Sequence, residues 1–78
     1  MNETIGERLR RMRKESGLSA VEISKQIRMS ADYLRQVERG EHEPGIFMAA
    51  QLSKVFGVSL DYLACLTEHQ NNPYVKRT

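Results

Sequence analysis

The sequence predicts an all-α domain of five short helices. Apolar residues recur at the i, i+4, i+7 spacing of one helix face, as Ile5, Leu9 and Met12 do near the start of the chain. Ser and Thr, which favour the first position of a helix, and Gly, which favours the position after its end, stand at the borders of such segments. No segment alternates apolar and polar residues in the manner of a β-strand.

The first two helices are bounded by residues that favour helix ends. Thr4 precedes the first apolar stripe as a candidate N-cap, and Gly17 follows it as a candidate stop, so we expect a helix over about residues 4–15. Ser19 stands three residues before Glu22, which is the capping-box pattern of a helix start. The second helix is therefore expected to begin at Ser19 and to continue to about residue 27.

A very short connection joins the second helix to the third. Only Arg28-Met29 stands before Ser30, the candidate cap of a helix over about residues 30–39 that Gly40 terminates. Two helices joined so closely cross steeply, as in a helix-turn-helix unit. The apolar residues expected to hold this pair together are Leu18, Ile23, Ile27, Met29, Leu34 and Val37.

Two further helices are expected in the second half of the chain. Residues 41–44 read as a loop, and an apolar segment after Pro44-Gly45 continues to Gly57. Ser59 then caps a short fifth helix that contains Leu60, Leu63 and Leu66.

Composition and charge limit the function. A chain of 78 residues holds one modest core, so an elaborate active-site cleft is not expected. Residues 1–40 hold nine Lys and Arg against six Asp and Glu, whereas residues 41–78 hold three against four. Basic side chains of the first half are candidates for phosphate contact, the alternative being a solvated helix surface. They are Arg8, Arg10, Arg11, Arg13, Lys14, Lys25, Arg28, Arg35 and Arg39.

We expect the protein to have neither a cofactor nor a metal site, and we do not expect it to be an enzyme. Cys65 and His69 have the i, i+4 spacing of two zinc ligands on a helix, but two ligands do not make a site. Cys65 also lacks a base that could activate it as a nucleophile, and a lone cysteine forms no intramolecular disulfide. The chain has no leader pattern at its start and no run near the ~18 apolar residues of a membrane span, so we expect a cytoplasmic protein without a membrane partner.

Several sequence blocks resemble the phage-repressor and Cro-like helix-turn-helix regulators, also called the xenobiotic-response-element family. They extend over roughly residues 5–66 and are Ile5-Gly-Glu-Arg-Leu-Arg, Gly17-Leu-Ser, Ser30 through Val37-Glu-Arg-Gly40, Glu41 through Pro44, and Gly57-Val-Ser-Leu-Asp61-Tyr-Leu63. The resemblance implies a five-helix lambda-repressor-like DNA-binding domain over residues 1–68, with the helix-turn-helix at helices 2 and 3. Residues 69–78 lack helical periodicity, and we expect a C-terminal tail that is either disordered or docked onto the partner in a dimer.

The resemblance also implies which residues face double-stranded DNA. In this family the third helix enters the major groove, which places Ala31, Asp32 and Gln36 toward base edges, with Tyr33 and Arg35 at the margins. Gln36 can pair with adenine, Asp32 can accept from cytosine, and Ala31 can touch a thymine methyl. The residues expected at phosphates are Ser19, Arg28, Ser30, Arg35, Arg39 and His42. For the two serines the alternative is a role as helix caps alone, and for Arg39 and His42 it is simple solvation.

Three positions depart from the family pattern. Ala20 stands where the family often has a Gln that touches phosphate, and Arg28 stands where it usually has a left-handed Gly. A residue with a side chain in that conformation costs about 1 kcal/mol or more, unless the turn differs. Phe47 and Met48 stand where polar residues are more common, so they form an exposed apolar patch or pack on the tail.

The resemblance further implies one structural ion pair and a dimer surface. Arg13 and Glu38 occupy positions that form a buried pair between the first helix and the end of the third. The family's dimer surface includes the fifth helix, and we assign Leu63 to the core. The residues expected at a homodimer interface are Leu60, Tyr62 and Leu66, with Tyr74 and Val75 as candidates for docking onto the partner.

These expectations lead to two hypotheses. The first is a homodimeric, sequence-specific DNA-binding protein that regulates transcription, either a repressor or a controller protein of prophage, plasmid or restriction-modification type. It has neither a small-molecule ligand nor room for a sensor domain. The alternative is a protein-interaction module, such as an antitoxin or adaptor, that binds through Phe47, Met48 and the tail. Ala20, Ala31 and Asp32 favour the alternative because they weaken the DNA-facing surface.

Overall fold

The computed structural model describes residues 3–70 and contains five helices. They are α1 (Ile5–Ser16), α2 (Ala20–Ile27), α3 (Ala31–Glu38), α4 (Ile46–Phe56) and α5 (Leu60–Leu63). The prediction of an all-α domain is confirmed, and within residues 3–70 there is no strand. The fifth helix is shorter than expected, because it ends at Leu63 and leaves Leu66 in the segment that follows. No helix in this part of the chain is long and apolar enough to cross a bilayer.

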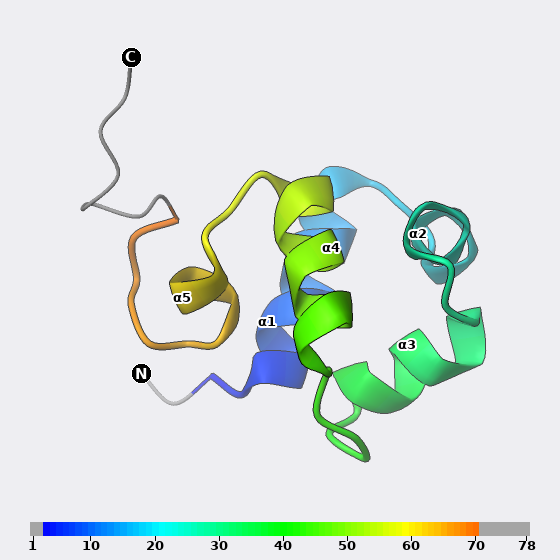
Figure 1. The fold of residues 1–78 in the computed structure, drawn as a ribbon, viewed down its shortest axis with the longest axis horizontal. Helices are drawn as coiled ribbons and strands as arrows, with labels where there is room; N and C mark the ends of the chain where they lie inside the picture. Colours follow the sequence, from blue (N-terminus) through cyan, green and yellow to red (C-terminus); the bar gives the residue numbers. More distant parts are fainter. Residues whose placement is uncertain (1–2, 71–78) are drawn as a thin grey trace.

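The helices are arranged around α1 and α4, which lie side by side in the middle of the molecule (Figure 1). The α2–α3 pair lies on one side of them and α5 on the other. Figure 1 views α2 nearly end-on while α3 runs across the picture, so the two helices cross steeply. This is the geometry expected for helices joined by a short turn.

Side-chain caps start four of the five helices, as the sequence predicts. Ser19 Oγ accepts from the backbone N–H of Glu22 at 3.0 Å, and the Glu22 carboxylate accepts from the backbone N–H of Ser19 at 2.9 Å. Thr4 forms a second capping box with Glu7. Ser30 and Ser59 cap α3 and α5 in the same way through their hydroxyl oxygens. These caps satisfy backbone donors that a helix leaves without partners in its first turn.

The turn between α2 and α3 keeps a left-handed residue although no glycine is present. Arg28 has φ 56° and ψ 36° and forms the C-cap of α2. The turn therefore does not differ from the family geometry, and the strain of a side chain in this conformation stays in the molecule. The Arg28 side chain is exposed at the junction of the two helices.

One hydrophobic core joins all five helices. Its buried members are Leu9, Met12, Ala20, Ile23, Ile27, Leu34, Val37, Met48, Leu52, Tyr62 and Leu63. The expectation that Met48 shares a surface patch with Phe47 is wrong, because Met48 is only 3% exposed whereas Phe47 is 84% exposed. Met48 lies one turn before Leu52 on the inner face of α4, and the adjacent position 47 points outward.

A glycine allows α1 to pass close to the end of α3. A Cβ atom on Gly6 would lie 2.5 Å from the carbonyl oxygens of both Val37 and Glu38. These are backbone atoms, which cannot move aside as a flexible side chain could. Gly6 therefore fixes the distance between α1 and the helix that carries the candidate site.

Candidate nucleic-acid interface

The exposed side of α3 is polar and lies opposite the core. Its buried residues are Leu34, Val37 and Glu38, so helical periodicity places positions 32, 35, 36 and 39 on the outer face. Asp32, Arg35 and Arg39 are exposed there, and Gln36 is half-buried between them. Of the expected base-reading residues, Asp32 and Gln36 lie on this face, while Ala31 and Tyr33 lie half-buried at its two edges.

Both arginines of this face are paired with carboxylates. Arg35 Nη1 lies 3.0 Å from Asp32 Oδ1, and Arg39 Nε lies 2.6 Å from Glu41 Oε2. The bond from Arg39 holds the pKa of the Glu41 carboxyl below its usual range. Exposed pairs of this kind are worth at most about 1 kcal/mol, so a phosphate can replace the carboxylate at little cost. The geometry keeps the cations at the surface without burying them.

Two helix N-termini and two further basic side chains are exposed in the helix-turn-helix unit and the loop that follows it. Ser19 and Ser30 are exposed at the starts of α2 and α3, where the helix dipole favours anions. Each hydroxyl oxygen is already used as a cap, so a phosphate would meet the remaining backbone amides of the first turn. Arg28 is exposed in the turn between the two helices, and His42 is exposed in the loop after α3.

The rings of Tyr33 and His42 are stacked. Their centroids lie 5.5 Å apart and their planes are inclined by 24°. The stack joins the first turn of α3 to the loop that follows the helix. Two residues that the sequence assigns to different roles, one to bases and one to phosphates, are thus in direct contact.

An ion pair holds α3 onto α1. Arg13 donates from Nε to Glu38 Oε2 at 2.7 Å and from Nη2 to Glu38 Oε1 at 3.0 Å. Arg13 also donates to the backbone carbonyl of Leu18, in the connection from α1 to α2. The structure therefore brings together the two residues expected to pair, and the pair orients the helix-turn-helix unit relative to α1.

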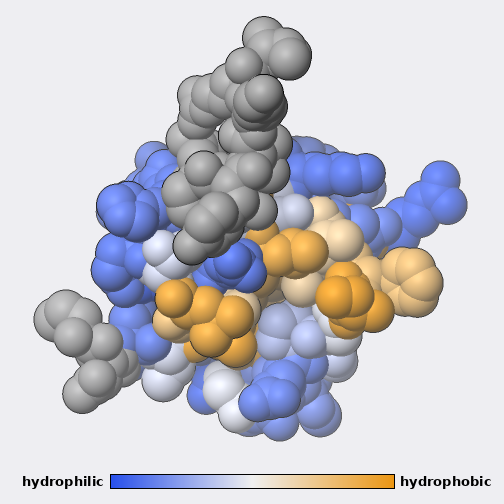
Figure 2. Space-filling view, turned by 60° about the vertical axis from the view of Figure 1, so that its left-hand side comes forward, coloured by the Kyte–Doolittle hydropathy of each residue, from blue (hydrophilic) through white to orange (hydrophobic). Residues whose placement is uncertain are grey.

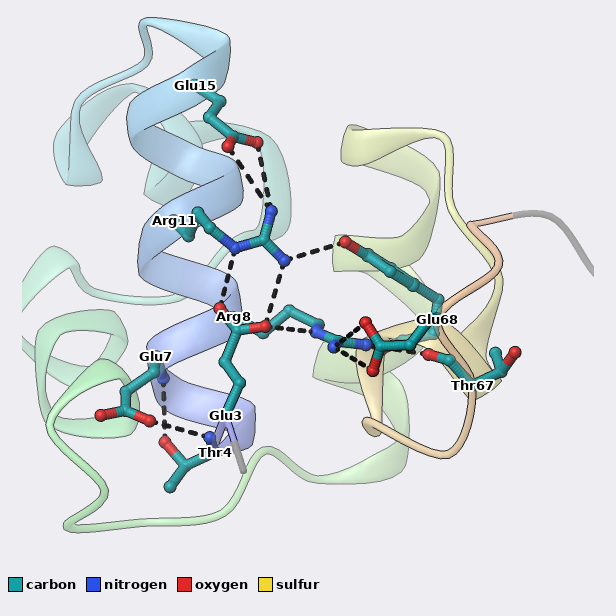
Figure 3. A network of polar contacts seen from close by, with 9 residues as sticks. Glu3, Thr4, Glu7, Arg8, Arg11, Glu15, Thr67 and Glu68 are labelled. Carbon is teal, nitrogen blue, oxygen red and sulfur yellow. Dashed lines mark hydrogen bonds and ion pairs between the residues drawn. The ribbon is translucent and has the colours of Figure 1, made fainter. Parts of the chain in front are cut away.

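Arg8 has a structural role that the sequence reasoning missed (Figure 3). The sequence assigns it to the basic surface, which is wrong, because Arg8 is 2% exposed. Its guanidinium donates to the carboxylates of Glu3 and Glu68 and to the backbone carbonyls of Tyr62 and Thr67. These bonds fix the segment after α5 onto α1. A signal was present, because position 8 is the i+3 position of the apolar stripe that starts at residue 5.

Tyr62 belongs to the core, so its assignment to a dimer interface is wrong. The residue is 4% exposed, its hydroxyl accepts from Arg11 Nη2 at 2.9 Å, and the Arg8 guanidinium lies 4.3 Å from the centre of its ring. The two other expected interface residues, Leu60 and Leu66, are exposed. Contact with two arginines explains the burial, because the hydroxyl and the ring face both find partners inside the protein.

Apolar residues gather on the side of the molecule that carries α5 (Figure 2). Leu60 of α5 and Ile46 at the start of α4 line one shallow hollow between these helices. Phe47, which follows Ile46 in the sequence, is 84% exposed, and Leu66 after α5 is 77% exposed. We call these four residues, Ile46, Phe47, Leu60 and Leu66, the α4–α5 apolar face. Phe47 and Leu66 are far more exposed than apolar residues of a core, and large exposed apolar side chains gathered on one side of a protein commonly mark an interaction site.

The possible zinc pair of the sequence does not form a helical site. Cys65 lies after the end of α5 and has a left-handed φ of 63°, so it does not share a helix with His69. Burial raises the pKa of the Cys65 thiol. Residues 3–70 contain no cluster of three side chains that could hold a metal ion. Tyr74 and Val75, the tail residues expected to dock onto a partner, lie outside the described residues.

Comparison with known families agrees with this geometry. A helix-turn-helix family model matches residues 9–63, which is more than half of the chain. The chain belongs to the helix-turn-helix family. Among curated proteins, this helix-turn-helix chain is 29% identical over 77 residues to the uncharacterized HTH-type transcriptional regulator y4dJ of Sinorhizobium fredii, covering 99% of this chain and 97% of the relative.

Solved structures give the same assignment. The P22 c2 repressor in complex with a synthetic operator is 34% identical, with a TM-score of 0.76 over 80% of this chain and 94% of that one. The N-terminal DNA-binding domain of SinR from Bacillus subtilis is 32% identical, with a TM-score of 0.72 over 80% and 91%. This helix-turn-helix chain therefore has the lambda-repressor-like fold of DNA-binding transcriptional regulators, a class that does not consist of enzymes.

Proposed function

We propose that this protein binds specific sequences of double-stranded DNA as a homodimer and thereby regulates transcription. The class we propose is a repressor or a controller protein of prophage, plasmid or restriction-modification type. The observation that carries the proposal is the outer face of α3, where Gln36 lies among exposed arginines. The helix-turn-helix unit that contains this face also has the exposed N-termini of α2 and α3. The P22 c2 repressor, to which the chain is similar, was solved in complex with an operator.

The chemistry of this face suits the major groove. The Gln36 amide carries both a donor and an acceptor, which matches the edge of adenine. The Asp32 carboxylate accepts a hydrogen bond from Arg35 and could accept one from the amino group of cytosine instead. Arg28, Arg35, Arg39 and His42 would contact phosphates and give an affinity that depends strongly on salt.

A homodimer would double this small reading surface. One helix in one groove reads only a few base pairs, and a two-fold pair would read two half-sites about one DNA turn apart. We assign the α4–α5 apolar face to the dimer contact, because Leu60 and Leu66 are exposed there together with Ile46 and Phe47. Burial of these side chains against a second copy would remove them from water.

The test is selection from a pool of random duplexes, followed by affinity measurements at low and moderate salt. The protein should enrich one sequence, and its affinity for that duplex should fall steeply as salt rises. Arg28→Ala and Arg35→Ala should each weaken binding. Lys54→Ala, which removes an exposed cation from the last turn of α4, is the matched control and should not. Failure to enrich any sequence would rule the proposal out.

The exposed Phe47 favours a second candidate function, a protein-interaction module such as an antitoxin or adaptor. The exposed carboxylate of Asp32 on the outer face of α3 supports it, because a negative charge there repels DNA. Absence of any selected duplex, together with a stable heterocomplex that Phe47→Ser disrupts, would decide for this function. The opposite result would be selective DNA binding by the parent, which Phe47→Ser weakens only because the homodimer is lost. That result would decide against the protein-interaction module.

A further inference from the structure

We propose that Tyr33 is a positioning residue for DNA binding, which acts by holding His42 and the loop after α3 in place for contact with phosphate. The inference rests on the proposed function and replaces the expectation that Tyr33 reads bases. It starts from the stack of the two rings, with centroids 5.5 Å apart and planes inclined by 24°.

Tyr33 is itself firmly held. It is the third residue of α3, and its backbone N–H donates to Ser30 Oγ at 3.0 Å. Its side chain is half-buried and packs against the hydrophobic core on one side, with His42 on the other. A ring fixed between the core and a second ring has little freedom to reach a base edge. The helix also turns position 33 about 100° away from position 32, which lies on the outer face.

His42 directly follows two loop residues whose backbone N–H groups are bonded to α3. The backbone N–H of Gly40 donates to the Val37 carbonyl at 3.0 Å, and that of Glu41 donates to the Gln36 carbonyl at 2.9 Å. The stack extends this attachment from Glu41 to His42. It therefore fixes the direction of the His42 side chain, whereas the backbone hydrogen bonds of the loop hold only Gly40 and Glu41.

The direction of His42 matters because its charged neighbours are mixed. Glu41 and Glu43 flank it along the loop, and Arg39 at the end of α3 pairs with Glu41. Glu7 of α1 and Glu43 line the same hollow as His42. His42 thus lies at the edge of a hollow that also holds carboxylates, and the stack on Tyr33 holds its ring against α3. An imidazole without this stack would be free to turn toward the carboxylates and away from a bound phosphate.

The experiment is a double-mutant cycle on the affinity for the selected duplex and for a scrambled one. Tyr33→Leu and His42→Ala should each lower the affinity for both duplexes by roughly two- to fivefold, which is the range of an exposed charge contact. Tyr33→Leu should cost nothing further when His42→Ala is already present, because it acts through that residue. Tyr33→Phe keeps the stacked ring and should bind as the parent does. Thermal denaturation of Tyr33→Leu should show a folded protein at the temperature of the binding measurement.

The pH profile supplies a readout specific to the imidazole. Imidazole is the side chain that gains a proton between pH 8 and 5, so a contact between His42 and phosphate makes the affinity rise as the pH falls. Tyr33→Leu and His42→Ala should both flatten this rise relative to the parent. Independent, additive losses, or a Tyr33→Leu variant that relaxes preference at one base pair, would overturn the inference while leaving the proposed function intact. A parent protein that selects no duplex would overturn both.

Discussion

Gly6 shows how one residue sets the distance between two helices. A methyl group at this position would lie 2.5 Å from two backbone oxygens of α3. We predict that Gly6→Ala lowers the free energy of unfolding by about 3 kcal/mol or more, because backbone must move to relieve the overlap. Urea denaturation would measure the loss. Gly45→Ala is the control, since a Cβ atom there meets nothing within 4 Å, and a similar loss in both variants would contradict the explanation.

Arg28 combines backbone strain with exposure in the turn between α2 and α3, where we propose contact with DNA. Asn tolerates left-handed backbone better than other residues with a side chain, and Arg28 has φ 56°. Arg28→Asn should therefore raise the free energy of unfolding by up to about 1 kcal/mol and weaken DNA binding. Thermal denaturation and DNA titration on the same variant would test the two signs. A variant that gains stability with undiminished affinity would show that Arg28 has no role at phosphate.

Contacts between residues near one another along the chain could be predicted well from the sequence. Contacts between residues of distant elements could not. The Ser19–Glu22 capping box and the Arg28 turn depend on neighbours within three residues, so their pattern is visible in the sequence. Arg8 looks like any other surface cation, because its partner Glu68 lies sixty residues further along the chain. Tyr62 was misplaced for the same reason, since Arg11 binds its hydroxyl from the opposite end of the chain.

At the scale of helices, the Arg13–Glu38 pair joins α1 to the last turn of α3. The Glu38 side chain is 5% exposed, so removing its partner would leave a nearly buried carboxylate unpaired. Arg13→Ala should lower the free energy of unfolding by about 3 kcal/mol. Arg35→Ala breaks the exposed pair with Asp32 and should cost less than about 1 kcal/mol. Chemical denaturation of both variants side by side would compare them, and equal losses would mean that burial does not govern the effect.

Glu3 anchors the start of α1 and should make stability depend on pH. Hydrogen bonds from Arg11 and Arg8 lower the pKa of its carboxyl to about 2, from 4.5 for a free side chain. A carboxyl with a depressed pKa in the folded state stabilises the protein above pH 4.5 and loses this contribution as the pH falls toward 2. Glu3→Gln should therefore be less stable than the parent at pH 7, and the difference should shrink between pH 4.5 and 2. Urea midpoints measured across this range would test the prediction, and a constant difference would contradict it.

The candidate site could be predicted only in part, because each helix is shared between core and surface. Spacing placed Gln36 and Asp32 on the outer face of α3, since Leu34 and Val37 define the inner one. The same spacing could not show that Tyr33 turns toward the loop, because that depends on where His42 returns beside the helix. Position 47 was recognised as unusual, but Met48 beside it was misplaced until the register of α4 on the core was known.

At the scale of the whole molecule, we propose two surfaces with different roles: the outer face of α3 for DNA and the α4–α5 apolar face for a second copy. Phe47 and Leu66 are 84% and 77% exposed, and Arg8 holds the segment that carries Leu66 onto α1. We predict that Phe47→Ser combined with Leu66→Ser shifts the protein toward monomer, because a dimer contact would lose its largest apolar groups.

The same double variant separates dimerisation from DNA contact. Sedimentation analysis should show the shift toward monomer, whereas Val21→Ser, which removes an exposed apolar side chain from α2, should leave the dimer unchanged. Affinity for a duplex with two half-sites should fall in the double variant, because two tethered reading helices are replaced by independent ones. Affinity for a single half-site should stay that of the parent, since α3 is untouched. Loss of half-site binding would mean instead that the α4–α5 apolar face supports the fold of α3 and is not a surface between two copies.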